Sequence, residues 1–213
     1  MTTVRVGLAA AFLAGCLLGV RFAALASGDQ PPASIVLLAG SIEHRAAYGC
    51  GVIVGDARDS IEVLTAGHNL GIDRLEVITV AGEYLRVRST RRVPNSDLAV
   101  LTTDRPHRAY EVAVRAAEAP IGTRVRMWGP IARQPFTPHD GLLRAIDPRV
   151  TDAPDGAVAL ECDRCDHGDS GTGMFDDRGR LVAIVTNGYF LNGVKLFVLG
   201  EGAASPLRAA FAP

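Results

Sequence analysis

Short runs of apolar or alternating residues recur along most of the chain, with Gly, Pro, Asn or Asp between them. Many of these runs are rich in β-branched residues and span four to eight positions. Such a pattern predicts strands, and its repetition is typical of an all-β sandwich or barrel. The expected strands cover residues 35–39, 51–54, 61–66, 75–80, 84–88, 98–102, 112–114, 123–128, 142–146, 157–160, 181–186 and 194–199.

Helical spacing of apolar residues is restricted to the two ends of the chain. Residues 1–26 show it, and the segment 206–211 is the candidate for a short C-terminal helix. A loop-like stretch at 118–120 divides the strands into two groups of about equal length. We therefore predict one domain at 34–205, an N-terminal lobe at about 34–117, a C-terminal lobe at about 118–205, and a tail at 206–213.

Residues 1–26 have the pattern of an export signal. Arg5 supplies a basic start, residues 6–20 are apolar, and Ala24-Leu25-Ala26 fits a signal peptidase site before Ser27. The apolar stretch holds 15 residues, fewer than the ~20 that span a bilayer comfortably. We therefore expect a cleaved signal peptide, a linker at 27–33, and a periplasmic or secreted protein.

A second processing signal overlaps the first. Leu13-Ala14-Gly15-Cys16 resembles a bacterial lipobox, in which Cys16 would be acylated and become the new N-terminus. Against it, the residues after Cys16 are apolar, whereas lipoproteins usually turn polar there. Simple export is the favoured interpretation, and contact with a membrane is expected only if Cys16 is lipidated.

Charge and cysteine content narrow the possible partners and the source of stability. The 213 residues carry a formal net charge of −1 and no basic run, so nothing indicates a nucleic-acid partner. The cysteines are Cys16, Cys50, Cys162 and Cys165, and cleavage before Ser27 leaves an odd number of them. Disulfides are therefore not the framework of the fold, and a hydrophobic core must hold it together.

The run Cys165-Asp166-His167-Gly168-Asp169-Ser170-Gly171 carries the strongest candidate chemistry. Glycines on both sides of Ser170 allow a sharp turn and a close approach of substrate. The amide N–H groups of Gly168 and Ser170 can point at one position, as an oxyanion hole requires. His167 adjoins the oxyanion glycine and is a candidate substrate contact.

A candidate base and a candidate orienting carboxylate precede that turn. Leu64-Thr65-Ala66-Gly67-His68 places a histidine at the end of an apolar strand, and Asn95-Ser96-Asp97 places an aspartate at the start of another. A carboxylate in that position can be buried and still accept hydrogen bonds. A serine nucleophile needs a base of near-neutral pKa and an acid that fixes the tautomer of the base. Several chain orders produce this geometry, and histidine, aspartate, serine is one of them.

Together these segments resemble the trypsin-like serine endopeptidases of the chymotrypsin fold. The resemblance rests on Thr65-Ala66-Gly67-His68, Asp97-Leu98-Ala99-Val100-Leu101 and Gly168-Asp169-Ser170-Gly171, with support from residues 49–54 and 181–188. It covers about residues 34–200. It implies two six-stranded antiparallel β-barrels packed against each other, with the active site in the cleft between them.

The same resemblance assigns roles to the candidate residues. It implies that His68 is the general base, that Asp97 orients it, and that Ser170 is the nucleophile of an acyl-enzyme mechanism. The N–H groups of Gly168 and Ser170 would form the oxyanion hole. No cofactor or metal is expected.

Substrate choice is less defined. By resemblance, Thr186, Asn187 and Gly188 form the strand edge that pairs with an extended peptide or protein substrate. The position six residues before the nucleophile is acidic in trypsin, and here it is Arg164, so a preference for basic side chains is not expected. If Arg164 points into the primary pocket, acidic side chains would suit it.

The remaining cysteines mark departures from animal members of the family. Asn69 stands where those relatives carry a cysteine that pairs with one near Cys50, so that disulfide is absent. Cys50 is then interpreted as a small buried hydrophobic residue. Cys162 and Cys165 have C-x-x-C spacing, and a local disulfide is the preferred hypothesis in an exported protein, with free thiols left open. Zinc would need two more ligands, and no second pair of this kind occurs.

Two other functional classes are kept as alternatives to an exported serine endopeptidase. A catalytically silent member of the fold would bind peptides without cleaving them, and the intact set of His68, Asp97 and Ser170 argues against it. A redox protein that uses Cys162 and Cys165 lacks the alternation of strands and helices expected around such a motif. We expect no peptide-recognition domain after the tail.

Overall fold

The computed structural model describes residues 30–117, 119–131, 134–146, 157–161, 165, 168–191 and 195–202. The predicted signal peptide, Cys16 and the predicted C-terminal helix lie outside these residues and stay predictions. The described residues from Pro31 onward belong to one compact unit. Within the described ranges, no helix is long and apolar enough to cross a membrane.

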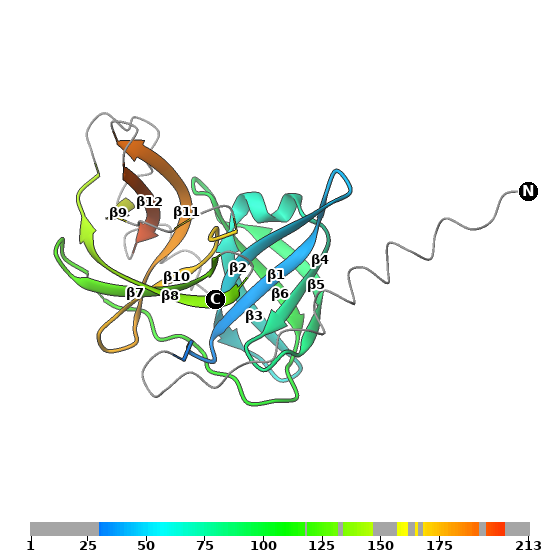
Figure 1. The fold of residues 1–213 in the computed structure, drawn as a ribbon. Helices are drawn as coiled ribbons and strands as arrows, with labels where there is room; N and C mark the ends of the chain where they lie inside the picture. Colours follow the sequence, from blue (N-terminus) through cyan, green and yellow to red (C-terminus); the bar gives the residue numbers. More distant parts are fainter. Residues whose placement is uncertain are drawn as a thin grey trace, which may run out of the picture. The chain divides into compact units, whose positions relative to one another are not determined.

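Six strands in the first half of the chain close into an antiparallel barrel, coloured blue to green in Figure 1. Around the barrel the order is β1-β2-β3-β6-β5-β4, and β4 pairs back onto β1. A short 3-10 helix, η1 (Gly67–Gly71), follows β3. The strands are β1 (Ile35–Ile42), β2 (Arg45–Asp56), β3 (Ser60–Ala66), β4 (Asp73–Thr79), β5 (Tyr84–Arg92) and β6 (Leu98–Asp104).

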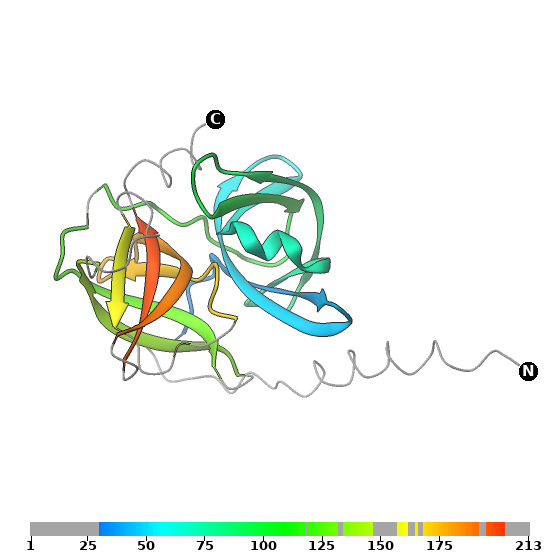
Figure 2. The same ribbon diagram turned by 90° about the horizontal axis from the view of Figure 1, so that it is seen from above.

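Six later strands close into a second antiparallel barrel in the order β10-β11-β12-β9-β8-β7. They are β7 (Arg124–Ile131), β8 (Gln134–Arg144), β9 (Ala157–Glu161), β10 (Gly173–Asp176), β11 (Leu181–Leu191) and β12 (Lys195–Gly202). Figure 2 shows the two barrels side by side, and β11 contacts β3 while β10 contacts β2. The prediction of two six-stranded β-barrels packed against each other is confirmed.

Strands at the contact between the barrels bury both of their faces, which explains their unbroken apolar runs. In β1, Val36 and Leu38 pack inside the first barrel, whereas Ile35 packs in a cluster with Trp128 and Phe175 of the second. Successive side chains of a strand point to opposite faces, so a strand covered on both sides needs no polar alternation. Burial of one such side chain contributes about 1.5–3 kcal/mol, so this apolar contact can hold the barrels together.

Two strand predictions were wrong. Residues 112–114 form no strand, although their pattern suggested one. Instead they run as an extended link between the barrels, where Ala113 N–H donates to Ile53 O and Leu181 N–H donates to Val114 O, each at 2.8 Å. The strand β10 was missed because its Gly-Met-Phe-Asp sequence is short and follows the glycine-rich serine turn directly.

Candidate active site

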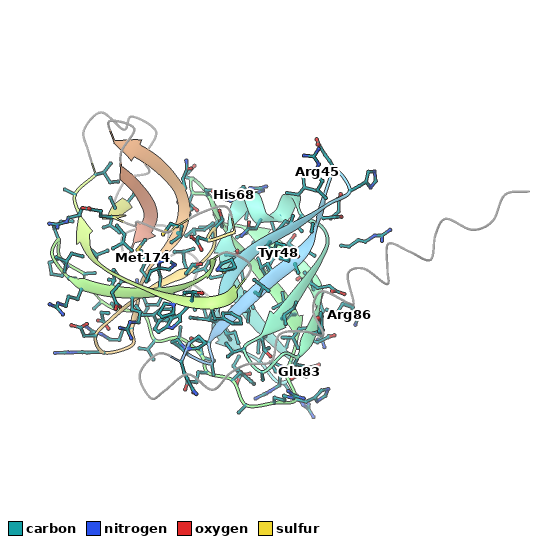
Figure 3. The ribbon with its side chains drawn as sticks, viewed as in Figure 1. Arg45, Tyr48, His68, Glu83, Arg86 and Met174 are labelled. Carbon is teal, nitrogen blue, oxygen red and sulfur yellow. The ribbon has the colours of Figure 1, made fainter. Side chains whose placement is uncertain are left out.

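Pairing of β3 with β6 brings the predicted base and the predicted acid together. Ala66, the last residue of β3, lies opposite Leu98, the first residue of β6. His68 therefore follows β3 on η1, and Asp97 stands directly before β6. Gly67 N–H donates to the backbone carbonyl of Asp97 at 2.7 Å, which joins the two segments beyond the strand ends. Figure 3 shows His68 beside η1, on the side of the first barrel nearer the second.

Asp97 holds the imidazole of His68 with one carboxylate oxygen and the backbone of His68 with the other. His68 Nδ1 lies 2.6 Å from Asp97 Oδ2, and the His68 backbone N–H donates to Oδ1 at 2.9 Å. A carboxylate partner favours a proton on Nδ1, which leaves the lone pair of Nε2 free to accept a proton. The two side chains are 49% and 37% exposed, so Asp97 is less buried than the sequence pattern suggested.

Ser170 lies in a turn that requires glycine on both sides. Gly168 and Gly171 have φ of 110° and 89°, which side chains rarely allow. At Gly171 a Cβ would also overlap the carbonyl oxygen of Cys50. Gly171 N–H donates to Val185 O at 2.7 Å, which anchors the turn on β11. The backbone therefore presents Ser170 in one defined position.

The carboxylate of Asp169 lies against β7 under the same turn. Asp169 is buried, and a Cβ at Gly129 would overlap its Oδ1. A Cβ at Gly168 would lie 3.1 Å from Cγ of Pro130. The pair Gly129-Pro130 thus packs against the serine turn, and glycine at position 129 leaves the space that the Asp169 carboxylate occupies.

The residue after His68 bonds directly to the serine turn. Asn69 Nδ2 donates to the carbonyl oxygen of Ser170 at 3.0 Å, and the backbone N–H of Cys50 donates to the same oxygen at 2.8 Å. The structure therefore brings Ser170 into one hydrogen-bonded network with the element that carries His68. Sequence reasoning did not single out Asn69 as a functional residue. Its one signal in the sequence was its place directly after His68.

The trypsin-like peptidase domain family matches residues 49–184, which is more than half of the chain. The chain belongs to this family. The matched region includes His68, Asp97 and Ser170, and it spans parts of both barrels. None of the curated proteins compared with the chain matches it.

Solved structures of proteases share the fold of this trypsin-like peptidase. The Rv3671c protease from M. tuberculosis in its active form is 21% identical, with a TM-score of 0.66, over 85% of this chain and 82% of the other. The thermostable serine protease AL20 from an extremophilic microorganism is 17% identical, with a TM-score of 0.64, over 84% and 95%. The serine endoprotease from Yersinia pestis is 21% identical, with a TM-score of 0.62, over 81% and 59%. With the family match, these findings make the chain a serine endopeptidase.

Cys50 lies behind the serine turn of the peptidase as a free, buried thiol. Its Sγ is 3.6 Å from the carbonyl oxygen of Gly168, within reach of a weak hydrogen bond. Burial raises the pKa of the Cys50 thiol to about 12, so it stays protonated and unreactive at neutral pH. The interpretation of Cys50 as a small buried residue is confirmed.

The predicted substrate edge of the peptidase lies on β11. Thr186 is buried, whereas Asn187 and Gly188 are exposed. Strand β10 pairs with β11 no further than Ile184, while β12 continues along residues 187–191. Among the described residues, one edge of β11 at 186–188 therefore has no strand partner. The side-chain Oδ1 of Asn187 accepts the Gly188 N–H at 2.8 Å.

Several predicted pocket residues fall outside the described part of the peptidase. Arg164, His167 and Cys162 are among them, so their roles stay predictions. Cys165 is buried and disulfide-bonded, so the alternative of a free thiol at this position is wrong. In the described ranges, no group of three His, Cys, Asp or Glu side chains is arranged to hold a metal ion.

Proposed function

We propose that this peptidase hydrolyses peptide bonds through Ser170, His68 and Asp97 and an acyl-enzyme intermediate. The observation that carries the proposal is the 2.6 Å contact between His68 Nδ1 and Asp97 Oδ2, which leaves Nε2 as the basic nitrogen. Further support comes from the hydrogen bond that Asn69, the residue after His68, donates to the carbonyl oxygen of Ser170. The order of the three residues along the chain agrees with the trypsin-like family.

Each step follows from these atoms. Nε2 of His68 takes the hydroxyl proton as Ser170 Oγ attacks the scissile carbonyl carbon, and the carbonyl electron pair moves to oxygen. The N–H groups of Gly168 and Ser170 stabilise that oxyanion. When the intermediate collapses, the C–N bond breaks and His68 returns its proton to the leaving amine. Water, activated by His68, then attacks the ester and frees Ser170 and the acid product.

The substrate of the proposed reaction is an extended peptide added as a strand to the open edge of β11 at residues 186–188. Main-chain hydrogen bonds along that edge would place the scissile carbonyl near Ser170. One similar structure, the HtrA-type protease AlgW, contains a tripeptide, and it is 19% identical with a TM-score of 0.61. Arg164 is proposed as a wall of the primary pocket, where it would favour acidic side chains.

Labelling with a fluorophosphonate probe tests the nucleophile. The probe phosphonylates only an activated serine, so we expect stoichiometric labelling of the folded protein at Ser170 and none in Ser170→Ala. Intact mass and peptide mapping measure both. Ser60→Ala, which removes a serine at the start of β3, is the control and should label like the wild type. Absence of labelling in folded wild-type protein, or undiminished labelling in Ser170→Ala, would overturn the proposal.

We also propose that the peptidase acts outside the cytoplasm after removal of residues 1–26. The support is the basic, apolar and small-residue order of this segment and the site before Ser27. Mass spectrometry of the exported protein should show Ser27 as the N-terminus, and Cys16→Ser should leave processing unchanged. An acylated N-terminus at Cys16, lost in Cys16→Ser, would instead establish a lipid anchor. Protein retained inside the cell with residues 1–26 intact would contradict export by either route.

A further inference from the structure

The side chain of Asn69 uses both of its N–H donors inside the protein. It is 4% exposed, although it lies on η1 directly after the exposed His68. Nδ2 donates to Thr65 Oγ1 at 2.9 Å and to the carbonyl oxygen of Ser170 at 3.0 Å. Loss of either partner would leave a buried N–H donor without an acceptor, which is unfavourable, so these bonds fix the side chain in place.

These bonds form part of a closed ring that joins the two barrels. Thr65 Oγ1, which accepts from Asn69, donates its own proton to the carbonyl oxygen of Cys50 at 2.6 Å. The N–H of Cys50 then donates to the carbonyl oxygen of Ser170 at 2.8 Å, which is the second acceptor of Asn69. Three members come from the first barrel and its helix η1, and one comes from the serine turn before β10.

The backbone leaves a space shaped for the amide of Asn69. A Cβ at Gly49 would lie 2.6 Å from Nδ2 and 2.9 Å from Cγ of Asn69. Any other residue at position 49 would therefore push the amide away from Ser170.

We propose that Asn69 is a positioning residue that sets the distance between the imidazole of His68 and the hydroxyl of Ser170. The inference rests on the proposed function, because it concerns the alignment of those two groups. His68 and Ser170 belong to different barrels, so small relative shifts of the barrels separate the base from the nucleophile. A misplacement of about 1 Å can cost roughly 100-fold in rate. Asn69 opposes such a shift because it directly follows His68 in the chain and its side chain donates a hydrogen bond to the carbonyl oxygen of Ser170.

Two variants of Asn69 test the role. Asn69→Ala removes both donors, and Asn69→Asp keeps the shape but places an oxygen against the carbonyl oxygen of Ser170. We expect each to lower kcat on a short peptide substrate, and the rate of fluorophosphonate labelling, by roughly 10- to 100-fold. The KM should change less than threefold, because the two hydrogen bonds of Asn69 go to Thr65 and Ser170 and not to residues 186–188 of β11.

The control separates positioning from stability. Thr103→Val removes a buried hydroxyl at the far end of β6, where it donates to Asp104 O at 3.0 Å. Both it and the Asn69 variants should lower the melting temperature, but only the Asn69 variants should lower kcat and the labelling rate of folded protein. If Asn69→Ala and Asn69→Asp, measured below their melting temperatures, label as fast as Thr103→Val, the positioning role is wrong. Wild-type protein that does not label at Ser170 would instead refute the proposed function.

Discussion

Asp97→Asn is expected to lower kcat by roughly 10⁴-fold while the protein stays folded. The reason lies in the two bonds that Asp97 makes to His68. The amide oxygen of asparagine can still accept the His68 backbone N–H, which is bonded at 2.9 Å to Oδ1. The amide NH₂ would then face Nδ1, which lies 2.6 Å from Oδ2 in the wild type. Nδ1 must then accept a hydrogen bond from the amide with its lone pair, so the ring proton lies on Nε2. The nitrogen that should take the serine proton then already carries one.

Steady-state hydrolysis of a peptide substrate and the rate of fluorophosphonate labelling both measure this loss. The matched control is Asp104→Asn, at the other end of β6, where the carboxylate bonds to Arg88 at 2.6 Å. The Arg88 guanidinium holds the pKa of Asp104 below its usual value, so the control also removes a charged, bonded aspartate. It should leave kcat within about twofold. Activity of Asp97→Asn within tenfold of the wild type would rule out Asp97 as the residue that orients His68.

Much of the fold was accessible from sequence because barrel strands carry a local signal. The runs around Val52, Leu64 and Val100 are apolar and bounded by turn residues, and each became a strand. The two errors in strand prediction arose where the local sequence pattern did not match the backbone hydrogen bonds that the segment makes in the fold. Residues 112–114 have strand-like alternation but bond to Ile53 and Leu181 of two different barrels, and β10 has too few residues to show any period. Both outcomes depend on tertiary pairing, which propensity does not encode.

The candidate site likewise contains residues that could be identified from the sequence and one that could not. His68 and Asp97 could be proposed because each lies next to a strand with a recognisable motif, and the β3–β6 pairing then brings the two segments together. Asn69 could not be proposed, because its acceptor on Ser170 is 101 positions away in sequence. An asparagine after a histidine is unremarkable until the fold shows a glycine opposite it. The side chains proposed to perform the reaction were thus visible in the sequence, while the side chain proposed to align them was visible only in the structure.

Gly171→Ala is expected to destabilise the protein by on the order of 3–5 kcal/mol and to disrupt the serine turn. Two costs add. A φ of 89° is strained for alanine, which costs about 1–3 kcal/mol. The new Cβ would also overlap the carbonyl oxygen of Cys50 and approach Thr65 Oγ1, two fixed members of the ring that holds Ser170. Because that carbonyl is backbone and bonded to Thr65, relief must come from movement of the serine turn itself.

Gly179→Ala separates the two costs. Gly179, in the turn between β10 and β11, has a similar φ of 70°, but a Cβ there meets nothing within 4 Å. The Gly179→Ala variant should therefore have a free energy of unfolding, measured with urea, only about 1 kcal/mol below that of the wild type. It should label with fluorophosphonate at the wild-type rate. Gly171→Ala should unfold at a much lower urea concentration, and its folded fraction should label at least tenfold more slowly than the wild type. Equal stability of the two variants would show that the serine turn can shift to accept the new Cβ without a further loss of stability. The close approach of Gly171 to Cys50 would then not be what fixes Ser170.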